Sequence, residues 1–379
     1  MALIQNATLP PAQPAYVLRG HNAQIHSVCF VRHNTRLLTG DAEGWLVLWN
    51  LASKRPVAVW RGHSAAILAL SSWADDRLIS HGRDNEPTFS VILPVEDSVT
   101  PRHEPWLLHT IPVNTLNFCS FSACEASASE AAQLSPDAID QALLVAVPGD
   151  TEGNIDVYSL PSKAKLSTIC APSTIKLGMA MCVKMLTQEG RLIVLAGYES
   201  GHCCLWRYDQ EKRQWALLSN IKNHSQPILS LDVAIGLRRY YTSAADANIA
   251  CYSLTDLTAS QPLKTSQTKH SGQQSLHVRS DDKIFATAGW DGCVRVYSAK
   301  TMRELAVLKW HKQGCYALAF ANLSSGDLES SADESTDPDQ KQASNTLQTV
   351  GQRRETKAQT THWIAAGSKD GKISLWDIY

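Results

Sequence analysis

The sequence of 379 residues lacks several features that identify whole classes of protein. No stretch reaches the roughly eighteen apolar residues that a transmembrane helix needs. Lys and Arg number 35 and Asp and Glu number 36, so the formal net charge is only −1. A balance this close to zero argues against broad nonspecific binding to nucleic acid or to an anionic membrane. The N-terminal residues 1–16 contain neither a basic segment nor an apolar core of signal-peptide length, so we expect no secretion.

Sequence motifs for common catalytic and metal sites are also missing. The chain has no Gly-x-Ser-x-Gly, no phosphate-binding Gly-x-x-x-x-Gly-Lys and no His-Glu-x-x-His. Its ten cysteines form no Cys-x-x-Cys, and the adjacent His202, Cys203 and Cys204 lie on an expected strand whose neighbouring side chains point to opposite faces. We therefore expect no catalytic residue, no metal and no cofactor, and buried thiols in a reducing compartment, either cytosol or nucleus.

A repeated pattern dominates what is present. A histidine is followed by apolar residues about four and seven positions later. A polar turn comes next, and then a strand that carries Trp or Tyr. Both His21 to Trp49 and His224 to Tyr252 span 28 residues. The copies begin at His21, His63, His109, His224 and His311, and the strands carry Trp49, Tyr158, Trp206, Tyr252, Tyr297 and Trp376.

The period of about 40–48 residues is that of a four-stranded propeller blade, which can bury its faces only against other blades. Seven turn strings are present, at 37–50, 78–85, 145–160, 194–206, 242–254, 287–298 and 365–377. The pattern therefore predicts an all-β, seven-bladed β-propeller. In each blade the histidine, a turn acid and the aromatic residue can form a buried hydrogen-bonded chain. The turn residues are Asp84, Asp246, Asp291, Asp370, Glu43, Glu152 and, in the fourth blade, Ser200.

The pattern also has gaps, and they predict that the buried chain is complete in only a few blades. Ile175 replaces the histidine of the fourth blade, and the apolar residues after His270 are displaced. The second blade lacks a clear Trp in its third strand.

The ends of the chain indicate how the ring closes. The last string, at 376–379, belongs to the third strand of a blade, and Tyr16–Arg19 can supply the missing fourth strand. Closure would remove the exposed sheet edges. We therefore expect a short flexible segment at 1–15 and a single propeller domain over 16–379.

Two insertions interrupt the period, at about 122–142 and 323–361. Both are poor in large apolar residues, which favours mobile loops on the rim opposite the turn acids. The second contains a run of acids and the weak acidophilic-kinase sites Ser330 and Ser331. Either insertion is a tolerated solvated loop or a docking segment.

The rim that carries the turn acids has unusual side chains for tight turns. Trp, Tyr and Arg dominate the energetics of protein interfaces, so this rim is a candidate partner-binding surface. Packing against neighbouring blades is the alternative for its aromatic residues. The candidates are Arg83, Tyr198, Glu199, Trp290 and Lys369.

The histidine pattern, followed by the turn and its aromatic-bearing strand, resembles the repeat of WD-repeat proteins over nearly the whole chain. Five sequence segments are more specific than the general repeat, namely SHGRDN, IDVYSLP, GYESG, ATAGWDGCVRVYSAKT and VLKWHKQGCYALAF. Together they resemble the ASTRA-associated protein 1 family of fungi and its animal counterpart, a G-protein-β-like WD-repeat protein. The resemblance implies a nuclear, non-enzymatic subunit of the ASTRA complex, linked to chromatin remodelling. It also implies partners in the co-chaperone machinery that matures phosphatidylinositol-kinase-like kinases, with the cytoplasm as a second location.

Three other propeller functions are alternatives to this one. About fifteen residues with Pro10, Pro11 and Pro14 leave no room for the N-terminal coiled coil of a G-protein β subunit. The Trp-Asp-x-Arg string of ubiquitin-ligase substrate receptors is absent at Trp49 and at Trp376. A histone-tail reader with an acidic or aromatic central mouth stays open.

Overall fold

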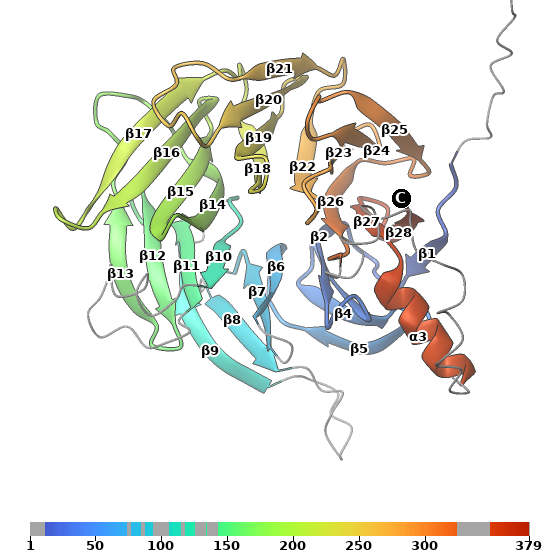
Figure 1. The fold of residues 1–379 in the computed structure, drawn as a ribbon. Coiled ribbons are helices and arrows are strands. Elements are labelled where there is room, and N and C mark those ends of the chain that lie inside the picture. The colour runs from blue at the N-terminus through green and yellow to red at the C-terminus, as the bar shows by residue number, and fades with distance from the viewer. Residues whose placement is uncertain are drawn as a thin grey trace, which may run out of the picture.

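The computed structural model describes residues 12–73, 77–84, 88–93, 106–114, 118–125, 134, 143–323 and 349–378. Their strands form seven four-stranded sheets, arranged as blades around a central axis (Figure 1). The seven-bladed propeller expected from the repeat is confirmed. Within each sheet, successive strands pair antiparallel, and the first strand lies nearest the axis.

The strands of blades 1 to 4 follow one another along the chain. Blade 1 contains β2 (Ile25–Val31), β3 (Arg36–Asp41), β4 (Trp45–Asn50) and β5 (Arg55–Arg61). Blade 2 contains β6 (Ile67–Trp73), β7 (Arg77–Gly82), β8 (Thr88–Leu93) and β9 (Trp106–Pro112). Blade 3 contains β10 (Ser122–Glu125), β11 (Leu143–Pro148), β12 (Ile155–Leu160) and β13 (Ala164–Ile169). Blade 4 contains β14 (Ala180–Gln188), β15 (Arg191–Tyr198), β16 (His202–Asp209) and β17 (Gln214–Lys222).

The last three blades include the one that closes the ring. Blade 5 contains β18 (Ile228–Ala234), β19 (Arg239–Ala244), β20 (Asn248–Ser253) and β21 (Lys264–Gln267). Blade 6 contains β22 (Gln273–Val278), β23 (Ile284–Gly289), β24 (Cys293–Ser298) and β25 (Glu304–Lys309). Blade 7 contains β26 (Cys315–Phe320), β27 (Trp363–Ser368), β28 (Lys372–Asp377) and the N-terminal β1 (Tyr16–Arg19).

The closing strand is held by both hydrogen bonds and packing. β1 pairs antiparallel with β28, with Leu18 opposite Ile373. Leu18 is only 1% exposed and packs in a cluster with Ile25, Trp49 and Leu375. The predicted closure by the N-terminal strand is therefore confirmed.

Among the described residues the core consists of seven apolar clusters, and each combines residues of two neighbouring blades. Between blades 5 and 6, for example, Tyr241, Phe285 and Tyr297 stack in series with ring centroids 4.7 and 5.0 Å apart. Fully burying one such side chain stabilises the fold by about 1.5–3 kcal/mol. The sheets are thus held to each other by the aromatic and branched residues that the repeat places on both faces.

The first insertion begins later than the composition suggested. Ser122–Glu125 is a strand, β10, which pairs with β11 through Ser122 opposite Ala146. The predicted insertion at 122–142 is therefore wrong in its first four residues. Of the remainder, only Leu134 lies among the described residues, and it packs against the cluster between blades 3 and 4.

The second insertion contains a helix, α3 (Val350–Thr360), which was not expected (Figure 1). Thr349 and Gln352 form a capping box at its start. The Trp363 indole donates to the Ala358 carbonyl at 3.1 Å, and the Asn34 amide donates to the carbonyl of Gln359. The prediction of a mobile loop over all of 323–361 is wrong for α3, while 324–348 and the sites Ser330 and Ser331 lie outside the described residues.

Candidate docking face and central channel

Blade 1 contains the complete buried chain that the repeat predicts. The Trp49 indole donates to the Thr39 hydroxyl at 2.9 Å. His21 bridges that hydroxyl, 2.7 Å from Nε2, to the Asp41 carboxylate, 2.7 Å from Nδ1. All four residues are at most 9% exposed. The chain ties the loop before blade 1, which we call an inter-blade loop, to the turn between the second and third strands.

The predicted acid of blade 1 is wrong by two residues. Glu43 is exposed, and its backbone N–H donates to Asp41 at 2.9 Å. Desolvation raises the pKa of Asp41, but hydrogen bonds from His21 and from the N–H groups of Trp45 and Glu43 outweigh it and hold that pKa below its ordinary value. Asp41 rather than Glu43 therefore anchors the turn.

Blades 2, 5 and 7 repeat the histidine–acid pair. His63 lies 2.8 Å from Asp84, and His224 lies 3.1 Å from Asp246. The Nε2 atoms of these histidines lie 2.8 Å from the hydroxyls of Ser80 and Thr242, respectively. In blade 7, His311 Nδ1 lies 3.4 Å from Asp370. His311 Nε2 and the Trp376 indole meet at the Ser374 hydroxyl, at 2.9 and 2.8 Å.

In blade 6, different residues replace the histidine and its hydrogen-bond partners. The fully buried Gln273 takes the place of the histidine and accepts from the Thr287 hydroxyl at 2.7 Å. Asp291 pairs with the buried Arg295 guanidinium at 2.5 Å. His270, half exposed, lies 3.4 Å from Asp291. The displaced spacing after His270 reflects this exchange.

The two remaining predicted blade residues, His109 and Trp206, lie in blades 2 and 4. His109 lies in β9, the outermost strand of blade 2, opposite Val91, so its assignment as an inter-blade histidine is wrong. The match arose because Val113 and Leu116 happen to follow His109 at the spacing of the repeat. Trp206 lies in β16 of blade 4, which lacks the chain, and makes an edge contact with Tyr198 at 6.0 Å.

The predicted rim residues divide into buried and exposed ones. Tyr198 is fully buried, and its hydroxyl donates to the carbonyl of Gly153 in blade 3 at 3.0 Å. Its assignment to a partner-binding rim is therefore wrong, since it packs between blades. Glu199 and Lys369 are exposed. Glu199 accepts from the backbone of Met179 at 3.4 Å.

Arg83 and Trp290 lie beside the opening of the central channel. The Arg83 guanidinium stacks over the Phe118 ring at 4.1 Å. The Trp290 indole donates to the Gln274 side chain at 2.8 Å. Phe118 and Gln274 both line the channel, so these two rim residues continue its surface outward.

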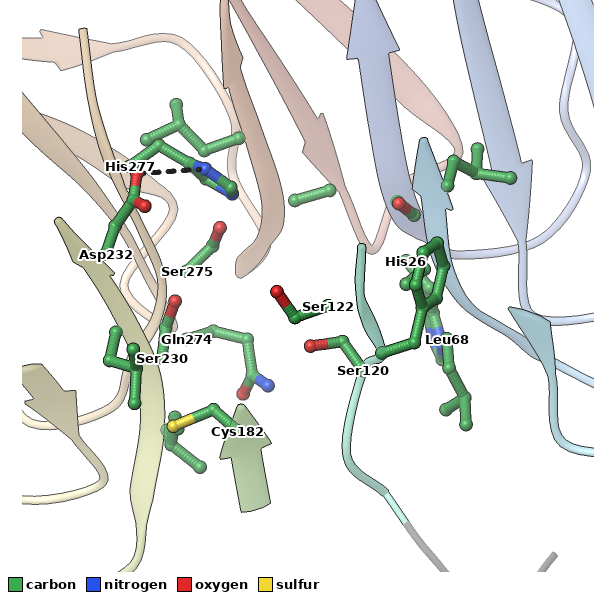
Figure 2. Close-up of a pocket in the computed structure, with 18 of the residues that line it drawn as sticks. His26, Leu68, Ser120, Ser122, Cys182, Ser230, Asp232, Gln274, Ser275 and His277 are labelled. Atoms are coloured by element: carbon green, nitrogen blue, oxygen red, sulfur yellow. Dashed lines mark ion pairs between the residues drawn. The ribbon is translucent and has the colours of Figure 1, made fainter. Parts of the chain in front are cut away.

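The channel has a volume of about 320 Å³ and is lined by residues of every blade (Figure 2). In six blades the pairing between the first two strands shifts by one residue at the second position of the first strand. Such a bulge re-aims a side chain. All six bulged residues line the channel, as does Phe118 of blade 3, and we call these seven residues the mouth ring. They are His26, Leu68, Phe118, Met181, Leu229, Gln274 and Tyr316.

Glycines hold the turns close to the neighbouring inter-blade loops. Gly44 has a φ of +84°, and a Cβ there would overlap the His63 carbonyl of the next loop. Gly201 has a φ of +82° and lies in the same way against His224. Only glycine readily adopts a positive φ and also leaves room for a carbonyl this close. These contacts join the turns and loops into one face.

Deeper in the channel, three titratable residues form a cluster. The Lys184 ammonium lies 2.8 Å from Asp232. His277 Nδ1 lies 3.7 Å from the same carboxylate, and Figure 2 shows this pair. The negative charge of Asp232 raises the pKa of Lys184, and desolvation lowers the pKa of His277. Desolvation raises the pKa of Asp232, but the charges of Lys184 and His277, together with hydrogen bonds from Lys184 and the Val278 N–H, outweigh it and leave that pKa below its ordinary value. The lysine and the carboxylate thus neutralise each other at neutral pH.

Metal-ligating side chains are dispersed over the described residues. Among them, no group of three or more His, Cys, Asp or Glu is placed to hold a metal ion. All ten cysteines are free, and burial raises the pKa of the Cys203 thiol to about 12. No helix in the described part of the chain is long and apolar enough to cross a membrane.

Comparison with known proteins assigns the family. An ASTRA-associated protein 1 from Verticillium alfalfae is 43% identical over 98% of this chain and 94% of its own length. A protein of the same name from Schizosaccharomyces pombe is 31% identical over 97% of this chain and 99% of its own. The chain belongs to the ASTRA-associated protein 1 family.

A more distant relative extends beyond fungi. The guanine nucleotide-binding protein subunit beta-like protein 1 of Mus musculus is 27% identical over 98% of this chain and 97% of its own length. The model of the WD domain, G-beta repeat, matches residues 12–50, 260–298 and 358–377. These matches fall in blades 1, 6 and 7 and in the outer strand of blade 5, and they include the blade that β1 closes.

Proposed function

We propose that this member of the ASTRA-associated protein 1 family is a non-enzymatic scaffold subunit of the ASTRA complex. The observation that carries the proposal is the similarity over nearly the whole chain to fungal proteins named for that association. A rigid propeller suits the role because its packed blades present loops in fixed positions. The described site, a face of structural histidines and exposed side chains around a channel, supports binding rather than chemistry.

The proposal includes where the protein acts and with which partners. We place it in the nucleus, with the cytoplasm as a second location, in contact with ASTRA subunits and with co-chaperones that mature phosphatidylinositol-kinase-like kinases. Chromatin remodelling would then depend on the complex that the scaffold joins. Direct contact with nucleic acid, a membrane surface or a small-molecule substrate is not part of the proposal.

Affinity purification from native nuclear extract, followed by mass spectrometry, tests this function. The tagged protein should recover ASTRA subunits together with giant kinases. A variant with impaired folding, such as one lacking residues 1–20, serves as the control for nonspecific capture. Recovery of cullin-ligase components or G-protein γ chains in place of ASTRA subunits would overturn the proposal while leaving the propeller intact.

A further inference from the structure

The mouth ring presents an apolar and aromatic surface at the open end of the channel. Five of its seven members are Leu, Met, Phe or Tyr, and His26 makes an edge contact with Tyr316 at 6.1 Å. Desolvation lowers the pKa of His26, which keeps its ring uncharged at neutral pH. Phe118 is 53% exposed and Trp290 beside the ring is 46% exposed. Exposed aromatic residues gathered at a hollow are typical of a docking site for an apolar side chain.

The accessible charges around the mouth ring are mainly basic. Exposed Lys and Arg number nine in the described turns, inter-blade loops and adjoining strand ends of this face, namely Arg19, Arg61, Arg83, Lys176, Lys222, Lys269, Lys309, Lys312 and Lys369. Exposed acids there number five, namely Glu43, Asp150, Glu152, Glu199 and Asp291, of which Asp291 is paired with Arg295. The carboxylates of Asp41, Asp84 and Asp246 are bound to histidines inside the loops and so cannot pair with a partner.

Four of the basic residues occupy the same position in the repeat. Arg19, Arg61, Lys222 and Lys309 each stand two residues before the inter-blade histidine, at the last position of an outer strand. They therefore surround the face at its periphery, while Arg83 stands at its centre against Phe118. A ligand with one apolar side chain and flanking negative charges would match both the apolar mouth ring and the basic residues around it.

We propose that this face docks an acidic peptide segment of a partner protein, with one apolar side chain in the mouth ring and carboxylates against Arg83, Lys369 and the peripheral basic residues. The proposal deepens the scaffold function and rests on it, since it specifies the chemistry of the partner. Complementary charge governs the choice of partner and the rate of association. A lysine- and arginine-rich histone tail carries the wrong sign for this face.

Fluorescence anisotropy with a labelled synthetic peptide tests the proposal on the intact protein. The probe is a peptide of about ten residues, about 33 Å long when extended, rich in Asp and Glu with a central Leu-Phe pair. A second peptide replaces the apolar pair with Gly-Ser, and a third replaces the acids with Lys. We expect saturable binding of the first peptide alone, weakened by added salt because exposed charges are screened.

Two charge-reversal variants locate the binding face. Arg83→Glu with Lys369→Glu should weaken binding of the acidic peptide about tenfold or more. The matched control, Lys300→Glu with Arg303→Glu, reverses two exposed charges in the turn between β24 and β25, at the opposite end of a blade, and should leave binding unchanged. Phe118→Ser should weaken binding as well, and its exposure means that the change leaves folding intact.

Several outcomes would overturn the proposal. They are no anisotropy change up to about 100 μM protein, equal or tighter binding of the Lys peptide, and equal losses in the two charge-reversal variants. Sedimentation that shows a dimer, lost on removal of the acidic stretch 327–339, would identify a second copy of this chain as the occupant and would also overturn it. Peptide binding without recovery of ASTRA subunits would instead refute the proposed function and keep the docking face.

Discussion

Replacing Asp41 with alanine tests the structural role of the buried chain in blade 1. The carboxylate accepts three hydrogen bonds, from His21 at 2.7 Å, from the Glu43 N–H at 2.9 Å and from the Trp45 N–H at 3.0 Å. Losing a net hydrogen bond costs about 0.5–1.5 kcal/mol, and leaving a buried group such as the imidazole without its partner costs about 1–3 kcal/mol. We therefore expect Asp41→Ala to lower the free energy of unfolding by about 2–4 kcal/mol.

The neighbouring acid provides a matched control. Glu43 is exposed and contributes only its backbone N–H to this network, so Glu43→Ala should change the free energy of unfolding by less than about 0.5 kcal/mol. Urea unfolding followed by tryptophan fluorescence gives both midpoints under identical conditions. The reasoning is refuted if Glu43→Ala shifts the midpoint as far as Asp41→Ala does.

Three further predictions concern packing, closure and acid stability. Tyr198→Phe removes the bond to Gly153 and should cost about 1 kcal/mol, measured by urea unfolding; a variant as stable as wild type would show that this inter-blade bond adds nothing. Deleting residues 1–20 removes β1 and should lower both yield and melting temperature, whereas unchanged values would disprove closure by the N-terminal strand. The depressed pKa values of Asp41 and Asp246 give stability that is present above about pH 4 and is lost as the pH falls further, because the unfolded state then binds more protons. In a variant with both Asp41→Ala and Asp246→Ala, the free energy of unfolding should therefore fall less steeply as the pH is lowered below about 4. An unchanged slope of that free energy against pH would contradict this.

The blades were predictable because their pattern is local and strongly spaced. Except in blade 2, the third strand of each blade ends near a Trp or Tyr, as in Trp49 and Trp376, which pack between blades. The closing strand was predictable from the number of strands in the repeats, because the last repeat supplies only three strands and Tyr16–Arg19 remains to supply the fourth. Neither inference requires knowledge of a long-range contact.

The details of the network were not predictable, because they depend on backbone geometry. Asp41 and Glu43 are both acids in one turn, and only its fold decides which carboxylate faces His21. An outer strand of blade 2 imitates the inter-blade pattern at His109. Tyr198 occupies an exposed-looking turn, yet its ring lies between blades 3 and 4.

The mouth ring has a sequence signal of its own, which the 40–48-residue period of the repeat does not reveal. In blades 1, 2 and 5 a fully buried Ile is followed at once by the bulged residue, as in Ile25 and His26. Reading that second position around the ring would have placed the apolar residues at the channel. The helix α3 gave a weaker signal, the Thr349–Gln352 capping box before a charged stretch.

We propose that this propeller is a scaffold and that the face around the mouth ring binds ASTRA partners. The most direct measurement is quantitative mass spectrometry of complexes recovered with the wild-type protein, with Arg83→Glu and Lys369→Glu, and with the control Lys300→Glu and Arg303→Glu. Wild type and control should recover equal amounts of ASTRA subunits, while the Arg83 and Lys369 variant should lose at least one of them. Equal recovery by all three proteins, or no ASTRA subunit with any, would contradict it.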